Sequence, residues 1–460
     1  MSGVIQTVAT QHSPETLVRR IGEYAGVVLL RTSLFDQSSS RYSFVSCQPF
    51  LTFRSSGSRC EVRTAEESQL QFGNPWHLLD RFMERYELLD ETDLPFPLGG
   101  CFGFWGYDLK NFVEPKLSSR AVDDLELPDC HVGFYDSLVV FDHHQKTCSV
   151  ISTGLLSDGS RSEENAAKQT RFWFNLLAEE PVDLPGYADS FEAGTISSNI
   201  SREQFIASVR KAQDYIRAGD IYQVNLSHRI TTRHSMDGWN LFLRLQDVSP
   251  SPFGAYLHCG DFELASSSPE SFLRMSGSHI RTRPIKGTRP RSADATRDAQ
   301  FTYDLQTSPK EISELVMITD LLRNDLGRVC SYGTVTVPEL LKLERYPQVQ
   351  HLVSTVEGNL APQITHFQAF ASCFPGGSIT GAPKFRAMEI IDELEPARRG
   401  PYTGALGYIG FNRESQLSII IRTAICQRGE THFNVGAGIV ADSIPEAEYE
   451  ETLAKAAGYL

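Results

Sequence analysis

The segment GALGYIGFNRESQLSIIIRTAICQRGETHFNVGA, residues 404–437, carries the clearest indication of the fold. It contains three runs rich in aliphatic and β-branched residues, separated by short polar connections: Gly404–Phe411, Ser418–Cys426 and Thr431–Ala437. Such runs are typical of β-strands, and short connections join antiparallel neighbours. The segment therefore predicts consecutive antiparallel strands.

The same pattern extends outward through the chain. Further strand-like runs are Gly26–Arg31, Arg41–Val45, Ser137–Asp142, Ser149–Ser152, Tyr222–Ile230, Phe253–His258, Phe262–Ser266, Ser271–Met275 and His279–Thr282. Helical periodicity is found at Trp76–Tyr86, Ser201–Ala218, Ser308–Asp320, Thr365–Ala371 and Glu446–Ala457. Because the strands follow one another like hairpins, we predict an α/β (α+β) chain with mostly antiparallel sheets and outer helices.

Composition excludes several classes of function. The net charge of −14 at pH 7 argues against binding to nucleic acid or to an anionic membrane, since both require a basic surface. The nine cysteines include no CxxC pair, so neither a disulfide framework nor a zinc site is expected. Without a signal peptide or a long apolar run, we expect a cytoplasmic protein. A Pro-, Gly- and Ser-rich stretch at 181–199 suggests a division into residues 1–190 and 191–460.

Two acidic pairs could bind a divalent cation. Glu311 and Glu314 are three residues apart on one predicted helix, as are Glu448 and Glu451 on another. This spacing places both carboxylates of a pair on one helix face. If the two faces meet, their oxygen ligands suit Mg²⁺. By periodicity alone, solvated surface glutamates explain the same spacing.

Three other features could carry chemistry, each with a simpler explanation. Lys286 lies in an apolar turn, where burial beside a cation would make its amine nucleophilic, although most lysines are on the surface. His351 alternates with apolar residues, as a packed core histidine also does. Glycines in Phe374–Pro383 precede a helical run and could form an anion site, or simply a turn.

Taken in order, these residues fall within motifs that resemble the chorismate-utilising enzyme family. The motifs are Ser268–Glu270, Pro284–Thr288, Asp320–Gly327, His351–Ser354, Pro375–Lys384, Tyr402–Gly407 and Gly436–Asp442. The resemblance is specific over about residues 200–457 and looser over 20–150. It implies two mostly antiparallel sheets packed across each other, as in anthranilate synthase large subunits. Region 1–190 would then be interwoven with a chorismate-binding catalytic region, 191–460, in one body.

The resemblance also implies a binding site for a dicarboxylate. Glu314 and Glu451 match Mg²⁺ ligands, with Glu311 and Glu448 nearby or acting through water. The ion would hold the ring carboxylate of chorismate. The enolpyruvyl carboxylate and the rest of the substrate would be held by residues matching Arg422, Tyr402 and Lys455 and by backbone around Gly376, Gly377, Thr380, Gly436 and Gly438.

Within the family, Lys286 is the discriminating residue. Anthranilate synthases usually have PIAGT at this motif, whereas many aminodeoxychorismate synthases have PIKGT, as here. A lysine could attack C2 of chorismate with loss of the C4 hydroxyl, after which ammonia adds at C4. Glu270 would act as the acid and base, with His351 and Mg²⁺ assisting. Gln223 replaces the lysine that activates water in isochorismate and salicylate synthases, which favours ammonia as nucleophile.

The resemblance therefore implies formation of 4-amino-4-deoxychorismate, a precursor of 4-aminobenzoate and folate. The motif at Gly99–Gly103 lacks the His-Gln that follows an amidotransferase cysteine, so a separate glutamine amidotransferase partner is expected. The chain ends at Leu460, and a separate lyase is expected to act downstream.

Two alternatives remain open: an anthranilate synthase large subunit, and a non-catalytic regulator that binds chorismate or tryptophan. Ser40 and Tyr42 lie in the segment that matches the tryptophan pocket of amino-group-adding relatives. One sequence does not establish whether that pocket is intact.

Overall fold

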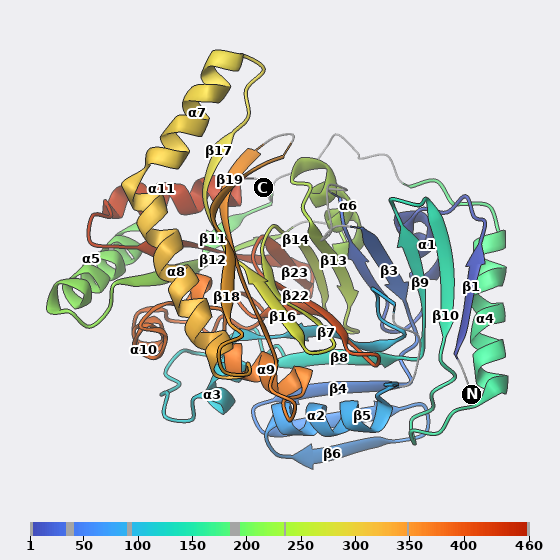
Figure 1. The fold of residues 1–460 in the computed structure, drawn as a ribbon. Helices are drawn as coiled ribbons and strands as arrows, with labels where there is room; N and C mark the ends of the chain where they lie inside the picture. The colour runs from blue at the N-terminus through green and yellow to red at the C-terminus, as the bar shows by residue number, and fades with distance from the viewer. Residues whose placement is uncertain are drawn as a thin grey trace.

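The computed structural model describes residues 3–33, 41–89, 94–184, 194–233, 236–346 and 349–457. They form two large antiparallel sheets with helices around them (Figure 1). The predicted fold class is confirmed.

The first sheet contains strands from both ends of the chain. Its order is β1 (Val4–Val8), β10 (Thr147–Ser152), β9 (Ser137–Asp142), β3 (Tyr42–Ser46), β2 (Val28–Arg31), β13 (Phe253–His258), β14 (Glu263–Ser268), β23 (Thr423–Gln427), β24 (Glu430–Ile439), β12 (Gln223–Arg233) and β11 (Ile196–Ser198), with β20 (Gly381–Ala382) paired to β12.

The second sheet is built in the same way. Its order is β17 (Ile285–Pro290), β19 (Val349–Asn359), β16 (His279–Arg283), β15 (Ser271–Ser276), β22 (Glu414–Ile419), β21 (Ala405–Gly410), β7 (Gly100–Trp105), β8 (Cys130–Tyr135), β4 (Leu51–Ser56), β5 (Arg59–Thr64) and β6 (Ser68–Phe72), with β18 (Thr336–Arg345) paired to β19. Strands from before and after the stretch at 181–199 therefore share both sheets, and that stretch does not separate two independent cores.

Helices surround the sheets. They are α1 (Pro14–Ile21), α2 (Pro75–Tyr86), α3 (Lys110–Val113), α4 (Glu163–Ala178), α5 (Arg202–Ala218), α6 (Gly238–Val248), α7 (Ala295–Thr307), α8 (Pro309–Gly327), α9 (His366–Cys373), α10 (Lys384–Leu394) and α11 (Pro445–Ala456), with the 3₁₀ turns η1 (Tyr107–Leu109) and η2 (Gly377–Ile379). None of the helices in the described ranges is long and apolar enough to cross a membrane.

Local sequence signals account for the ends of the predicted helices. Ser201 and Gln204 form a capping box at the start of α5, and Gly219 closes the helix at a φ of 83°. Helix α8 continues past the predicted end at Asp320, because Leu322 and Leu326 extend its buried face.

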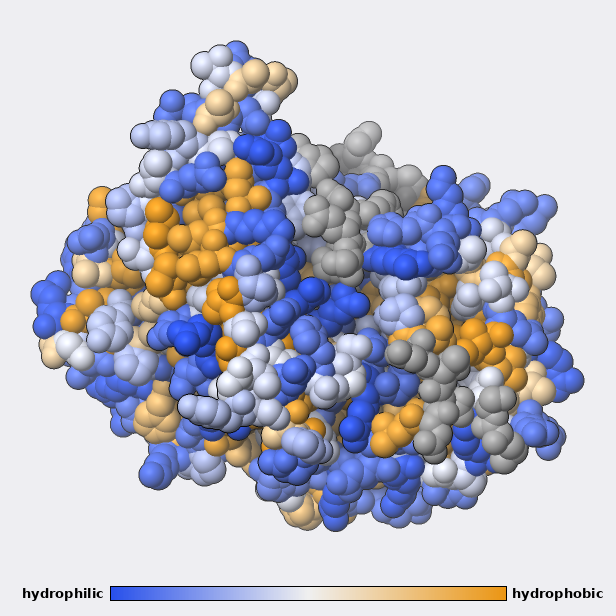
Figure 2. Space-filling view, in the orientation of Figure 1, coloured by the Kyte–Doolittle hydropathy of each residue, from blue (hydrophilic) through white to orange (hydrophobic). Residues whose placement is uncertain are grey.

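An apolar layer joins the two sheets. Phe104 and Leu406 of the second sheet belong to the same buried cluster as Leu138, Leu264 and Ile425 of the first. Burial on both sides of this layer explains why the two sheets pack face to face. Figure 2 shows that hydrophobic surface also remains exposed over α8, below the end of α7.

One predicted strand is wrong. The run Ser418–Cys426 is divided between β22, which ends at Ile419, and β23, which begins at Thr423. The two strands lie in different sheets, and Arg422 between them has a φ of 50°. The apolar residues on both sides of the break are buried, so the composition of the run does not reveal that the chain changes sheet here.

Candidate active site

A cavity of about 540 Å³ lies where β17, β19, α8 and α11 meet the segments that pass between the sheets. Ten of the predicted site residues line it: Glu270, Lys286, Glu311, Glu314, His351, Arg422, Gly438, Glu448, Glu451 and Lys455. Residues that are far apart in sequence therefore share one cavity.

Two crossing segments place Glu270 and Arg422. Glu270 lies between β14 and β15, and Arg422 lies between β22 and β23, so each sits where the chain leaves one sheet for the other. The segments are bonded together, because Ser268 Oγ donates to Ile419 O at 2.6 Å and Ser267 N donates to Arg422 O at 3.0 Å. The wall of the cavity is thus part of the connection between the sheets.

A bulge in β17 precedes the strand position facing His351. Lys286 pairs with Leu352 and Thr288 pairs with His351, which leaves Gly287 as the extra residue. Gly287 has a φ of 69°, and a Cβ there would lie 2.6 Å from Leu305 Cδ1. Lys286 Nζ lies 3.9 Å from Glu314 Oε2.

The acidic pairs of α8 and α11 line the same cavity, and several of their oxygens already have partners. Lys455 Nζ lies 2.8 Å from Glu451 Oε1, and Arg289 Nη1 lies 3.4 Å from Glu311 Oε1. Ser443 Oγ donates to Glu448 Oε1 at 2.6 Å. By contrast, Glu314 Oε1 is buried and has no hydrogen-bond partner in the described part of the chain.

These carboxylates have the chemistry of a site for a hard cation. Burial raises the pKa of Glu314, opposed by Lys286, and the charges of Glu311 and Glu448 raise it further. A divalent cation would stabilise the ionised form and supply a partner for the free oxygen of Glu314. In the present arrangement, no three His, Cys, Asp or Glu side chains within the described ranges are gathered closely enough to hold a metal ion.

Glu270 has the environment of a proton donor. Its side chain is buried, and burial raises its pKa, although a hydrogen bond from Ser378 and the charge of Lys286 lower it. Burial also lowers the pKa of His351, whose Nδ1 lies 2.9 Å from Thr288 Oγ1. Burial thus favours the protonated form of the Glu270 carboxyl and the neutral form of the His351 imidazole, and both side chains line the cavity.

Five predicted substrate-binding residues do not line the cavity: Tyr402, Gly376, Gly377, Thr380 and Gly436. Tyr402 packs behind Gly436, whose carbonyl accepts a hydrogen bond from Lys455 Nζ at 2.9 Å. Gly376 and Gly377 pack against Ile419 and Leu321, and Thr380 Oγ1 donates to Gly376 O at 3.0 Å. In this arrangement they support the wall, and direct contact with substrate stays a prediction.

Tyr42 lies elsewhere, at a second cavity of about 40 Å³ that Phe44, Phe253 and Tyr408 also line. Ser40 lies outside the described residues.

Several further residues line the cavity although no motif included them, among them Arg289, Lys310, Tyr346 and Pro250. Lys310 precedes Glu311 on α8, and Arg289 follows Thr288 in β17. The available signal was a basic residue directly beside a predicted site residue, Glu311, or beside the end of a motif, Thr288. Gln223, at the position where the resemblance places a water-activating lysine in isochorismate and salicylate synthases, is buried beside Gly438. Its Oε1 has no hydrogen-bond partner among the described residues.

Comparison with known proteins identifies relatives of this chain. A family model described as chorismate binding enzyme matches residues 37–460. The chain is 40% identical over 456 residues to anthranilate synthase component 1 of Thermus thermophilus, covering 98% of this chain and 96% of that protein. It is 38% identical over 454 residues to aminodeoxychorismate synthase component 1 of Escherichia coli, with the same coverage. The crystal structure of anthranilate synthase component I from Streptococcus pneumoniae superposes with a TM-score of 0.80 at 30% identity, covering 92% of this chain and 93% of that one.

Proposed function

Since this chain belongs to the chorismate binding enzyme family and is a chorismate-utilising enzyme of the anthranilate and aminodeoxychorismate synthase type, we propose that it is the synthase component of an aminodeoxychorismate synthase. It would convert chorismate and ammonia to 4-amino-4-deoxychorismate. Overall identity does not separate the two activities, because relatives of both names are similar to the chain to the same extent.

The observation that carries the proposal is the position of Lys286. Its side chain lines the cavity together with Glu270, and its charge acts on that carboxyl. An amine and a carboxyl whose pKa is raised by burial thus face the same space. An anthranilate synthase, which aminates C2 directly, needs no such amine.

The chemistry proceeds as two linked substitutions. Once deprotonated, the amine of Lys286 attacks C2, the two ring double bonds shift, and the C4 hydroxyl leaves as water after Glu270 donates its proton. Ammonia then attacks C4, the double bonds return, and the bond between C2 and the lysine nitrogen breaks. Glu270, now ionised, takes the surplus proton from the incoming nitrogen, so the enzyme ends in its starting state.

The remaining cavity residues suit a substrate with two carboxylates. Arg422 and Lys455 line the cavity and supply positive charge to it. Glu314 and Glu451, with Glu311 and Glu448 near them, would hold Mg²⁺, which when bound supplies positive charge to the ring carboxylate. His351, held by Thr288, would assist departure of the C4 hydroxyl.

Ammonia is the proposed nucleophile, supplied by a glutamine amidotransferase partner, and a separate lyase would act on the product. The names of the relatives as component 1 support a second component. Gln223 supports ammonia over water, because an amide cannot act as the base that activates water. Cys101 is fully buried on β7 with its thiol pKa raised by burial, so it lacks the environment of an amidotransferase nucleophile.

Product analysis tests the proposal. The chain would be incubated with chorismate, ammonium and Mg²⁺, and the products separated by chromatography with and without an added aminodeoxychorismate lyase. We expect 4-aminobenzoate only when the lyase is present. Fluorescent anthranilate formed without the lyase would instead identify an anthranilate synthase, and no turnover would favour the regulator that binds chorismate or tryptophan.

Replacement of the nucleophile tests the mechanism. Lys286→Ala should lower formation of aminodeoxychorismate by at least about a hundredfold, the usual scale of a lost covalent or acid–base contribution. The matched control is Lys342→Ala, which removes a surface lysine of β18 paired with Glu339. Unchanged formation of product by the Lys286→Ala enzyme would refute the covalent role.

A further inference from the structure

Helix α11 carries three of the side chains that line the cavity, Glu448, Glu451 and Lys455. These groups contact one another or the wall of the cavity: Lys455 Nζ lies 2.8 Å from Glu451 Oε1 and donates to Gly436 O at 2.9 Å. Groups that would bind a metal ion or a substrate exchange such contacts when the ligand arrives. The orientation of the helix must therefore be held through another of its faces.

The ion pairs on the solvent side of α11 do not supply that hold. Arg210 Nη2 lies 3.0 Å from Glu446 Oε1, and Arg202 Nε lies 3.6 Å from Glu450 Oε1. All four side chains are at least 45% exposed. Pairs as exposed as these contribute little, because water and salt screen their charges.

A buried histidine of β12 holds the helix instead. His228 is 1% exposed, and its Nε2 lies 2.8 Å from the hydroxyl of Thr452, which follows Glu451 on α11. That hydroxyl donates its own proton to Tyr449 O at 2.7 Å, so it accepts the proton carried by Nε2. The other ring nitrogen, Nδ1, then accepts a hydrogen bond from Ser198 Oγ at 3.0 Å. One tautomer of His228 thus satisfies both contacts.

Aromatic packing confines the same ring. The rings of His228 and Tyr449 are stacked, with their centres 5.7 Å apart and their planes at 20°, and Phe205 of α5 lies edge to face at 5.3 Å. Burial lowers the pKa of His228 to about 4, which favours the neutral ring that the two hydrogen bonds require. The imidazole is therefore enclosed on several sides between β12 and α11.

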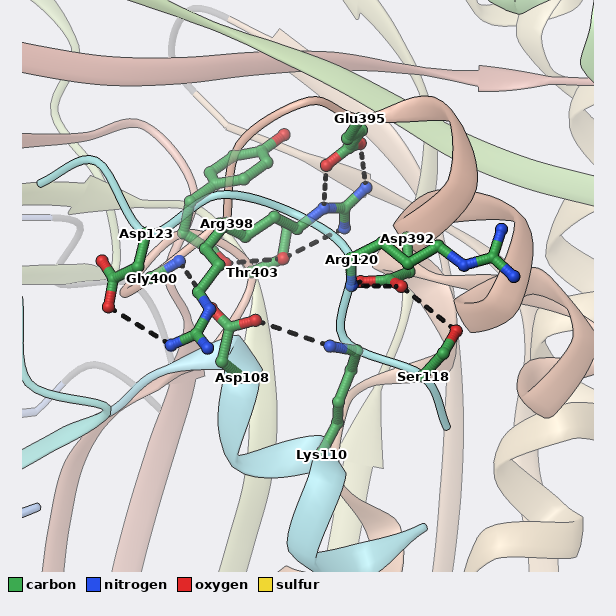
Figure 3. Close-up of polar contacts among 12 residues, drawn as sticks. Asp108, Lys110, Ser118, Arg120, Asp123, Asp392, Glu395, Arg398, Gly400 and Thr403 are labelled. Atoms are coloured by element: carbon green, nitrogen blue, oxygen red, sulfur yellow. Dashed lines mark hydrogen bonds and ion pairs between the residues drawn. The ribbon is translucent and has the colours of Figure 1, made fainter. Parts of the chain in front are cut away.

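On its opposite face, the strand that carries His228 is fixed by a buried ion pair behind the cavity. Successive side chains of a strand point to opposite faces, and Ser227 Oγ donates to Glu395 Oε1 at 3.0 Å. Glu395 is held by Arg399, whose side chain is 1% exposed, through hydrogen bonds of 2.6 and 2.8 Å (Figure 3). Strand β12 is thus a fixed base from which His228 reaches α11.

We propose that His228 is a positioning residue: its hydrogen bond to Thr452 orients α11 so that Glu448, Glu451 and Lys455 face the cavity before any ligand binds. The inference rests on the proposed function, which assigns these three groups to the metal ion and the substrate. His228 does not line the cavity, so it acts through the helix. Ligands then bind without having to order α11 first, which is the advantage of a preformed site.

Variants at both ends of the hydrogen bond test the proposal in the full chain. His228→Phe keeps a stacked ring but removes both hydrogen bonds, whereas His228→Gln keeps an amide N–H that can reach the place of Nε2. Thr452→Val removes the acceptor on the helix, and Thr452→Ser keeps it.

The matched control is His366→Phe, the same substitution at another buried histidine. His366 of α9 is 5% exposed, and its two ring nitrogens lie 2.8 Å from Ser415 Oγ and 2.8 Å from Gly277 O. It does not line the cavity and lies on a different helix from the acidic pairs. Circular dichroism and urea unfolding establish which variants fold, and Thr452→Val carries the test if His228→Phe does not.

We expect His228→Phe and Thr452→Val to raise KM for Mg²⁺ and for chorismate at least about fivefold, with kcat at saturation within about twofold of the wild type, because the apparent affinity falls with the population of the productive helix orientation. Hydrogen exchange measured by mass spectrometry should be faster in the α11 amides of both variants, and Mg²⁺ with chorismate should slow it again. His228→Gln and Thr452→Ser should recover most of the wild-type KM, and His366→Phe should change neither KM nor α11 exchange.

Wild-type KM values and wild-type α11 exchange in the folded His228→Phe and Thr452→Val enzymes would overturn the proposal. So would an equal rise in KM from His366→Phe, because a general loss of stability would then explain both. Anthranilate as the product would refute the proposed function, and turnover without Mg²⁺ would refute the metal assignment. In either case KM for chorismate and the exchange of α11 would still decide the role of His228.

Discussion

Gly287→Ala is the most direct test of how β17 is packed beside Lys286. The backbone of Gly287 has a φ of 69°, a left-handed conformation that costs a residue with a Cβ about 1–2 kcal/mol. The new methyl group would also lie 2.6 Å from Leu305 Cδ1 and 3.1 Å from Glu311 Oε2. Leu305 is fully buried, so moving its methyl group aside disturbs packed neighbours, and overpacking of this kind adds about 1–3 kcal/mol. The expected total is a loss of about 2–5 kcal/mol.

Gly277→Ala is the matched control. Gly277 has a φ of 55° in the turn between β15 and β16, and no atom lies within 4 Å of the position of an added Cβ. Gly277→Ala should therefore lower the unfolding free energy only by the cost of the left-handed backbone conformation, about 1–2 kcal/mol. Urea unfolding followed by tryptophan fluorescence measures both variants against the wild type. Equal losses for the two variants would refute the tight packing of the bulge against α7 and α8.

Three further predictions concern other parts of the molecule. Lys384→Met should destabilise the fold by about 3–5 kcal/mol, because Asp325 Oδ2, 2.6 Å from Lys384 Nζ, is left buried without its cation. Burial raises the pKa of Asp325, so the carboxylate left without its cation should take up a proton as the pH falls, and the destabilisation by Lys384→Met should become smaller. Equal destabilisation in urea unfolding at pH 8 and pH 5 would contradict this reasoning. Burial lowers the pKa of His366 to about 4, so its contribution to stability is complete above the unfolded value near 6.5 and declines as the pH falls toward 4. The difference in unfolding free energy between wild type and His366→Gln should therefore narrow over that range, and a constant difference would count against it. For the proposed metal, EDTA should abolish turnover and excess Mg²⁺ should restore it, whereas Glu314→Gln and Glu451→Gln should weaken Mg²⁺ binding measured by calorimetry at least about tenfold; wild-type affinity in either variant would remove that residue from the ligand set.

Local patterns predict an element correctly where the residues that determine it lie within a few positions of one another. The predicted strand Phe253–His258 agrees with β13 at both ends, and the cap at Ser201 marks the start of α5. The predicted strand at Ser418–Cys426 fails because its hydrogen bonds go to two different sheets. No local pattern records which neighbouring strand a residue will pair with.

In the candidate site, too, some features can be predicted from the sequence and others depend on the tertiary structure. The three-residue spacing of Glu311 and Glu314 and the lysine at 286 are visible in the sequence, and their side chains line one cavity. The Arg399–Glu395 pair has no comparable signal. Its residues are four apart, but Glu395 ends α10, so helical spacing does not explain their contact. Their partners Ile379, Asn225 and Ser227 come from other segments.

The sequence alone is sufficient to predict the class of fold, most of the strands and helices, and the residues whose side chains could take part in catalysis or binding. These depend on side-chain period, capping and residue type, which act over short distances. The folded chain is needed for the path of Glu270 and Arg422 between the sheets, for the placement of Tyr402 behind Gly436, and for the buried pair behind the cavity. Such contacts form because distant apolar segments are buried together, and their energies depend on neighbours that adjoin only in the tertiary structure.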